Sequence, residues 1–183
     1  MPRFINYSVF ISLILIFSFC QIRDAGLEAD VLKQSGVFLP VTKIVDGDTF
    51  WVDNGTEKGL KIRFIGIDAP ESRRMFNREI GYYGKEAKLY LTELLSNKKV
   101  KLVADIDPLD QYGRTLSYVY LEDGTFVNAE LIKNGFAVLM TVPPNVEFAD
   151  YFAKLQKQAR HNKRGLWKID NTLPVKNKLQ NKP

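Results

Sequence analysis

The chain has 183 residues, of which 45% are hydrophobic and 26% charged, and its formal net charge is +5. The length suits one domain and is too short for two of ordinary size, and the composition is the usual mixture of a soluble globular protein. Cys20 is the only cysteine, which excludes an internal disulfide, so the fold must depend on its core. The mild basic excess suits a polyanionic partner, but on charge alone a solvated helix face and a frayed tail are the better explanation.

The N-terminus differs from the rest of the chain. Residues 1–7 carry one basic residue and no acidic one, and Val9–Cys20 is uncharged. An apolar run of about a dozen residues at this place is short for a membrane span and favours an export signal over a buried core helix. Three fates stay open for the leader at 1–20: cleavage after Cys20, lipidation of Cys20, or retention as an anchor. We therefore expect a secreted, periplasmic or cell-envelope protein that contacts a membrane only through an uncleaved or lipidated leader.

After a linker at 21–36, residues 37–168 have the pattern of a single α+β domain. Alternating, β-branched segments predict strands over 38–45, 49–52, 60–67, 100–106 and 115–121. Helical periodicity predicts helices over 82–96, 127–134 and 147–162. About five short strands with interleaved helices indicate a small, strongly bent barrel, and the five-stranded Greek-key barrel is a frequent nucleic-acid platform. Residues 169–183 have too little apolar content to pack, and we expect a flexible basic tail.

The residue types that are missing narrow the possible chemistry. His161 is the only histidine, and it lies at the basic end of a predicted helix. A two-histidine nuclease mechanism, a histidine-rich zinc site and a Ser-His-Asp triad therefore lack suitable parts. No glycine loop of the P-loop type occurs either. Carboxylates, arginines and tyrosines remain, and sites made only of oxygen ligands favour hard cations such as calcium or magnesium.

Three segments place these groups at the ends of predicted strands. Residues 46–49 (DGDT) form a turn with two carboxylates, residues 63–71 (RFIGIDAPE) carry an arginine, an aspartate and a glutamate, and residues 110–114 (DQYGR) end in an arginine. Each has a plain alternative: an aspartate-rich turn, a strand with one exposed arginine, and a loop. Together they supply what phosphodiester hydrolysis needs. Arginines meet the growing phosphate charge, carboxylates hold a metal, and a glutamate takes or orients the proton of the attacking water.

The sequence resembles the staphylococcal nuclease-like, or thermonuclease, family over roughly residues 38–167. The motifs that carry the resemblance are VDGDT (45–49), RFIGIDAPE (63–71), YGKEA (83–87), DQYGR (110–114), VNAELIKNGFA (127–137) and RGLW (164–167), in the family's order and spacing. The resemblance implies an α+β fold with a five-stranded OB-type barrel and three helices. It also implies a Ca²⁺-dependent endonuclease that hydrolyses phosphodiester bonds of DNA and RNA at the 5′ oxygen and leaves 3′-phosphates.

The resemblance further assigns roles to residues of this chain. Asp48, Asp68 and the backbone carbonyl of Ala69 would bind calcium. The phosphate would be contacted by Arg63 and Arg114, the attacking water by Glu71, and the substrate also by Tyr112. Two departures from the family's pattern affect its grip on the nucleotide: Gln111 replaces a lysine, and residues 140–145 (MTVPPN) lack two tyrosines of the base pocket. The hydrolytic groups are all present, whereas base preference stays open.

Two functions of other classes fit parts of the sequence. One is a barrel that binds nucleic acid without cutting it, and the other is an envelope-anchored interaction protein. Family members that only bind usually lose the acids or the arginines, and this chain retains both. We expect a monomer that acts on DNA and RNA.

Overall fold

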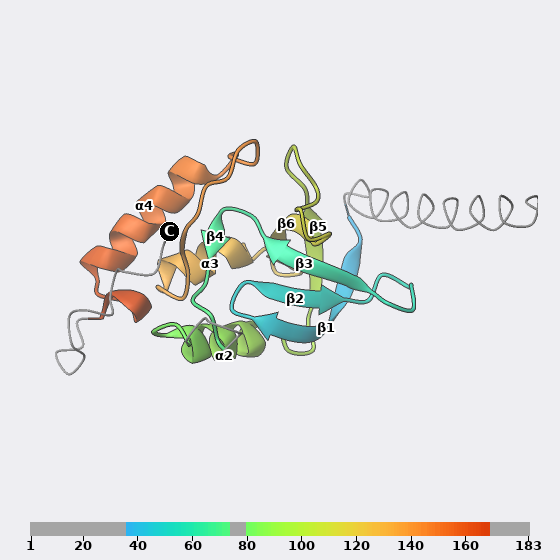
Figure 1. Ribbon diagram of the computed structural model, residues 1–183, viewed down its shortest axis with the longest axis horizontal. Helices are drawn as coiled ribbons and strands as arrows, with labels where there is room; N and C mark the ends of the chain where they lie inside the picture. Colours follow the sequence, from blue (N-terminus) through green and yellow to red (C-terminus); the bar gives the residue numbers. More distant parts are fainter. Residues whose placement is uncertain (1–35, 74–79, 169–183) are drawn as a thin grey trace, which may run out of the picture.

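The protein is described by a computed structural model over residues 36–73 and 80–168. The predictions for the leader, for the linker up to residue 35 and for the tail at 169–183 lie outside these residues. Within them, five strands close into a barrel in the order β1-β2-β3-β6-β5, and β4 pairs with β7 in a separate ribbon (Figure 1). The barrel strands are β1 (Phe38–Asp46), β2 (Thr49–Val52), β3 (Leu60–Phe64), β5 (Lys99–Val103) and β6 (Thr115–Leu121).

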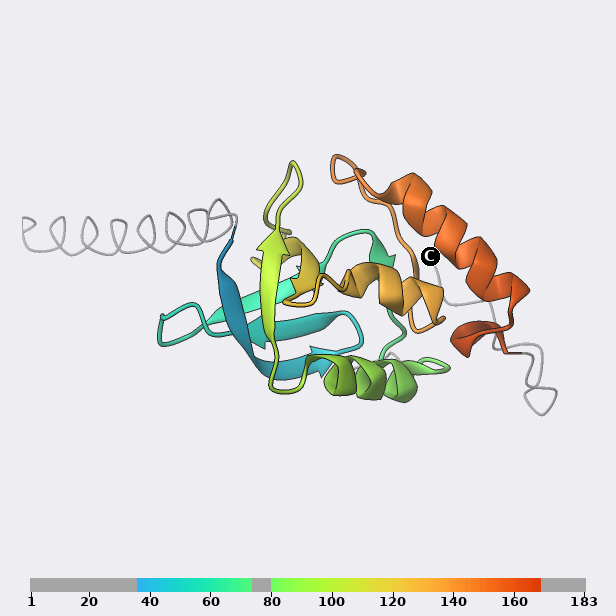
Figure 2. The ribbon, with the colours of Figure 1, turned by 180° about the vertical axis from the view of Figure 1, so that it is seen from behind.

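The remaining elements lie to one side of the barrel and beneath it. They are β4 (Ile67–Asp68), α2 (Gly84–Leu95), α3 (Val127–Lys133), β7 (Val138–Leu139), α4 (Ala149–His161) and the 3₁₀ helix η1 (Gly165–Trp167). Seen from behind, α2 runs below the barrel, and α3 lies between the barrel and α4 (Figure 2). The expected α+β class, the five-stranded barrel and its three helices are thus confirmed for the described part of the chain. None of the helices described is long and apolar enough to cross a membrane.

Alternating side chains build the barrel core. Phe50 and Val52 of β2 are fully buried, whereas Trp51 between them is only half-buried. In β3, Leu60, Ile62 and Phe64 point inward in the same way. The two strands pair antiparallel with Thr49 opposite Arg63, while β3 and β6 pair parallel with Arg63 opposite Leu116. The register therefore places Arg63 on the outer side of the barrel, at the end of β3.

The strand predicted over residues 60–67 is interrupted, and in this respect the prediction was wrong. The chain turns at Gly66, whose φ of +77° lies in the left-handed region that favours glycine. A Cβ atom there would lie 2.8 Å from the Phe152 ring, so the close packing of α4 also requires glycine. After this turn Ile67 and Asp68 leave the barrel and pair with Leu139 and Val138. The turn thereby moves Asp68 away from the direction of β3.

Helix α2 is also shorter than the stripe of apolar residues suggested. Ala87 and Leu91 are fully buried against the barrel, as expected for a helix that faces the core. Tyr83, by contrast, precedes the helix with a left-handed φ of 69°, and Tyr90 is only partly buried. Both tyrosines lie at the edge of the core.

Asn128 of α3 connects the helix to the barrel inside the protein. Its side chain is fully buried, accepts a hydrogen bond from the backbone N–H of Val119 at 2.9 Å, and donates one to the carbonyl of Ile65 at 2.9 Å. Loss of this side chain would leave a backbone donor and an acceptor buried without these partners.

We expect Asn128→Ala to lower the free energy of unfolding by about 2–4 kcal/mol and the melting temperature by about 5–10 °C. Chemical and thermal denaturation measure both quantities. Asn162→Ala, at the exposed end of α4, is the matched control and should melt close to the wild type. Equal melting temperatures for the two variants would show that Asn128 does not hold α3 to the barrel.

Candidate active site

Asp48 belongs to the turn between β1 and β2, and its carboxylate is buried, with only 7% of the residue exposed. One oxygen, Oδ2, accepts a hydrogen bond from the backbone N–H of Ala69 at 2.8 Å, and the other accepts one from the Thr49 hydroxyl at 3.0 Å. Burial raises the pKa of Asp48, and the nearby Arg63 guanidinium opposes this only in part. A cation placed beside Asp48 would favour the ionised form.

Arg63 lies between two carboxylates. Its Nη1 atom is 2.8 Å from Asp48 Oδ2, and its Nη2 atom is 3.0 Å from Asp68 Oδ1. Nη1 is buried, and its contact with Asp48 is an ion pair without the alignment of a hydrogen bond, whereas Nη2 donates a hydrogen bond to Asp68. The Arg63 side chain is only 12% exposed, and that of Asp68 is 36% exposed. The three charges thus form one cluster that opens to solvent on the side of Asp68.

The turn at residues 46–49 is fastened to the segment that carries Glu71. Asp46 Oδ1 accepts hydrogen bonds from the backbone N–H groups of Gly47 at 2.9 Å and Ser72 at 3.2 Å. A Cβ atom at Gly47 would approach the Cβ of Ala69 to 2.8 Å, so the two segments are in direct contact. Because residues 69 and 72 are each bonded to this turn, Glu71 is held next to the Asp48 cluster.

A second support for Glu71 comes from the start of α2. The Glu71 carbonyl accepts a hydrogen bond from the backbone N–H of Gly81 at 2.9 Å. A Cβ atom at Gly84 would overlap with that carbonyl, so the first turn of α2 packs directly on the Glu71 backbone. This close approach explains the glycine in the YGKEA motif.

Arg114 is positioned by Asp110, four residues earlier in the chain. The Arg114 Nε atom lies 2.6 Å from Asp110 Oδ2, and Asp110 Oδ1 accepts backbone hydrogen bonds from Tyr112 and Arg114, both at 2.9 Å. Burial alone would raise the pKa of Asp110, but these hydrogen bonds outweigh it and lower the pKa. Within the described residues no hydrogen bond or ion pair engages the two Nη atoms of Arg114, so the end of its fork can receive a ligand.

The structure brings most of the predicted site residues together. Arg63 is the penultimate residue of β3, and Arg114 directly precedes Thr115, which pairs with Ile62 of that strand. Tyr112 is 75% exposed, and its ring centroid lies 5.5 Å from the Arg114 guanidinium carbon. Gln111 is exposed as well, as are Met140 and Val142 in the segment that lacks the two tyrosines.

Sequence reasoning missed three positioning residues. Asp110 anchors Arg114, and the acid-to-arginine spacing of four residues was the available signal. Asp46 holds the backbone of Ser72, 26 residues away, for which the sequence gives no local signal. Asn145 exchanges hydrogen bonds of 2.8 Å with the backbone of Asp107 and so joins residues 140–147 to the loop that carries Arg114.

The donor atoms of this cluster suit a hard cation. Asp48 and Asp68 offer carboxylate oxygens, and the N–H of Ala69, whose carbonyl the family resemblance assigns to calcium, is bonded to Asp48. Both carboxylates already contact Arg63, and a cation would share them with this guanidinium. Among the residues described, no group of three or more His, Cys, Asp or Glu side chains is close enough to hold a metal. A site here would therefore depend on two carboxylates, a carbonyl and water.

Comparison with known proteins defines the class. The pattern of the family described as Staphylococcal nuclease homologue matches residues 61–169. The chain is 33% identical to the Thermonuclease of Staphylococcus intermedius over 154 residues, which cover 84% of this chain and 89% of that protein. It is 39% identical to the Thermonuclease of Staphylococcus hyicus over 128 residues, or 69% of this chain and 73% of that protein. Endonuclease YncB of Bacillus subtilis is 33% identical over 147 residues, which cover 79% of this chain and 68% of that protein.

These similarities, together with the five-stranded barrel, identify the class as a nuclease fold. The chain belongs to the staphylococcal nuclease-like family.

Proposed function

We propose that this protein is a Ca²⁺-dependent endonuclease that hydrolyses phosphodiester bonds of DNA and RNA and leaves 3′-phosphates. The observation that carries the proposal is the cluster in which Arg63 lies between Asp48 and Asp68. Such a cluster joins oxygen ligands for a hard cation to a donor fork for phosphate. The family relationship supports the reaction class.

In this proposal each side chain has one task. Arg114, fixed through Nε, presents its free Nη atoms to the phosphate. Arg63 meets the charge that develops on the phosphate as the water attacks, because its fork is held in place before the substrate binds. Glu71 accepts or orients the proton of that water. A bound calcium ion would supply Lewis-acid polarisation of a phosphate oxygen next to Asp48, Asp68 and the Ala69 carbonyl. Tyr112 covers Arg114 and contacts the substrate from the solvent side.

A barrel that only binds nucleic acid is the second candidate. The exposed Tyr112 beside Arg114 would suit such a protein. A protein that only binds nucleic acid has no use for a buried carboxylate at Asp48. Burial of this group behind Arg63 costs free energy, and Asp48 would make no contact with the nucleic acid in return. The preserved acids therefore favour hydrolysis.

Calcium dependence provides the direct test. Cleavage of plasmid DNA and of RNA should require calcium, stop with chelator and not recover with zinc, because the ligands are all oxygens. Asp48→Ala and Asp68→Ala should each weaken calcium binding, measured by calorimetry, by at least about tenfold, since even outer partners of a metal ligand are worth about 10–100-fold.

Asp150→Ala, at an exposed position in the first turn of α4, removes the same group outside the cluster and should leave the calcium affinity unchanged. Full activity in excess chelator would refute the metal assignment. A shift of nucleic acid on a gel without any cleavage would favour the binding module.

A further inference from the structure

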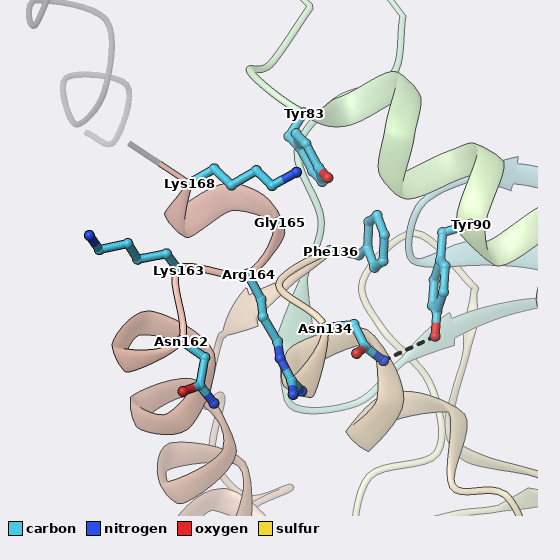
Figure 3. Close-up of a pocket in the computed structure, with 9 residues that line it drawn as sticks. All are labelled: Tyr83, Tyr90, Asn134, Phe136, Asn162, Lys163, Arg164, Gly165 and Lys168. Atoms are coloured by element: carbon cyan, nitrogen blue, oxygen red, sulfur yellow. Dashed lines mark hydrogen bonds between the residues drawn. The ribbon is translucent and has the colours of Figure 1, made fainter. Parts of the chain in front are cut away.

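A recess of about 580 Å³ lies where α2, the end of α3 and η1 meet (Figure 3). Tyr83, Tyr90 and Phe136 form one wall of it, and the turn that leads from α4 into η1 brings Arg164 and Lys168 to the other. Lys163 lies at the rim, and in Figure 3 its side chain extends away from the rings. Nothing in the proposed hydrolysis uses these residues. The combination of aromatic rings with several cations makes the recess a candidate binding site.

The basic side of the recess is rigidly attached to the fold. A Cβ atom at Gly135 would overlap with the Arg164 carbonyl, and one at Gly165 would overlap with the Gly135 carbonyl. The N–H of Leu166 also donates to the Gly135 carbonyl at 2.8 Å. Arg164 Nη1 also donates to the carbonyl of Lys133 at 3.3 Å. Lys163 has a left-handed φ of 52°, an uncommon conformation for a residue other than glycine. The cations are therefore held by ordered backbone and are not part of a frayed end.

The charged residues that line the recess are all basic, while Glu86 and Glu130 act on Tyr83 and Tyr90 from outside the lining. No acidic side chain lines the recess among the described residues, and neither Lys163 nor Lys168 forms an ion pair within that part of the chain. The nearby Glu130 is already paired with Lys133 at 2.8 Å. Burial raises the pKa of Tyr83 and of Tyr90, so both phenols stay neutral and do not repel an anion. An anion would be the complementary occupant.

The aromatic rings form a wall and do not offer a stacking surface for bases. Phe136 lies between the two tyrosines, stacked on Tyr90 at 4.0 Å and on Tyr83 at 5.6 Å between ring centroids (Figure 3). Asn134 fixes the Tyr90 hydroxyl with a hydrogen bond of 3.1 Å. Because the rings are engaged with one another, the recess suits recognition of backbone phosphates and not of particular bases.

The recess is also connected to the candidate active site. Tyr83 on its rim directly precedes Gly84, which packs on the carbonyl of Glu71. In Figure 3 the side chain of Lys168 extends toward Tyr83, on the same side of the recess. A strand that passes Glu71 can therefore continue along the start of α2 toward these cations.

We propose that this recess binds the phosphate backbone of a single-stranded nucleic acid beyond the bond that is cut. Its three cations contribute affinity for long substrates without sequence preference. The inference rests on the proposed nuclease function, since it extends the path of that substrate. A dinucleotide, which is too short to reach the recess, does not benefit from it.

The test uses the full chain and the variant Lys163→Gln/Lys168→Gln, with Arg164→Gln added in a triple variant. Anisotropy of a labelled single-stranded DNA of about 12 nucleotides, in chelator so that it stays intact, gives the Kd at several salt concentrations. For the triple variant we expect the Kd at low salt to rise on the order of tenfold and the slope of log K against log salt to fall by about 2, or about 0.7 for each lost phosphate contact. The double variant should show a smaller change in the same direction.

Lys58→Gln/Lys98→Gln/Lys99→Gln is the control matched in charge to the triple variant, since all three lysines are exposed and Lys58 lies in the loop between β2 and β3, at the opposite end of the molecule from η1 (Figure 1). Cleavage of a dinucleotide with calcium should stay unchanged in every variant. Equal Kd values and slopes for control and triple variant would overturn the inference, even if the wild type cleaves. If the wild type cleaves nothing, the nuclease proposal fails, and the anisotropy still decides on the recess.

Discussion

Replacement of Arg114 with lysine is expected to reduce the turnover of phosphodiester cleavage by about 10²–10³ and to leave the melting temperature almost unchanged. Lysine keeps the positive charge but has a single ammonium group, which cannot bind Asp110 and present two further donors to phosphate at once. Steady-state cleavage of a short oligonucleotide measures the loss. Arg114 precedes β6 and is not one of the buried core residues, so little core packing changes with it.

Arg160→Lys is the matched control for this prediction. Arg160 lies on α4 with its guanidinium carbon 4.3 Å from the centre of a Trp167 ring, away from the carboxylate cluster. The Arg160→Lys variant should keep wild-type turnover. If Arg114→Lys also cleaves at nearly the wild-type rate with an unchanged melt, Arg114 does not clamp the phosphate, and a plain binding surface becomes the better description.

Arg63→Lys should cause a similar loss of turnover, because lysine again lacks the planar fork. In this variant the stability of the protein will change as well. The guanidinium bridges Asp48 and Asp68, and an ammonium group at the end of a lysine cannot reproduce both contacts. The buried charge of Asp48 would then be balanced less well by a positive partner, and a poorly paired buried charge destabilises the folded protein. Arg114 is consequently the cleaner probe of phosphate binding, and melts must accompany every Arg63 measurement.

The barrel could be predicted from the sequence because its strands are short, rich in β-branched and aromatic residues, and partly alternating, most regularly in β3. Residues 49–52 matched β2 from end to end, since Phe50 and Val52 are fully buried and Trp51 between them is only partly buried. The ribbon of β4 and β7 could not be predicted. Its formation depends on the left-handed turn at Gly66 and on the contact of that glycine with Phe152, and no local pattern reports a partner so distant in sequence.

The candidate site, like the barrel, could be predicted only in part. Motifs placed Asp48, Arg63 and Asp68 at strand ends, and the pairing of Thr49 with Arg63 explains why they meet. The depth of burial of Asp48 was not predictable, because it results from Ala69 and α2 packing over the turn at Gly47. The hydrogen bond from Ser72 to Asp46 was hidden for the same reason. What the sequence lacks is information on which backbone groups of distant segments come into contact.

Glu71→Gln is expected to slow cleavage by about 10²–10⁴ while the calcium affinity stays nearly unchanged. The residues at positions 69 and 72 are hydrogen-bonded to Asp48 and Asp46, and Gly81 binds the Glu71 carbonyl, so the backbone of this segment is fixed from several sides. Glutamine has nearly the same shape and fits this frame. It cannot accept the proton of the attacking water, which is the role proposed for Glu71.

Three measurements on Glu71→Gln separate the possible roles of this residue. Steady-state cleavage, calcium titration and thermal melting should be run beside Glu122→Gln, which makes the same change in the exposed turn after β6. A large loss of turnover with normal calcium binding and an unchanged melt supports action on the water. Loss of calcium affinity in parallel with turnover would make Glu71 a metal ligand. Wild-type turnover would remove Glu71 from the mechanism and leave proton acceptance to another group or to solvent.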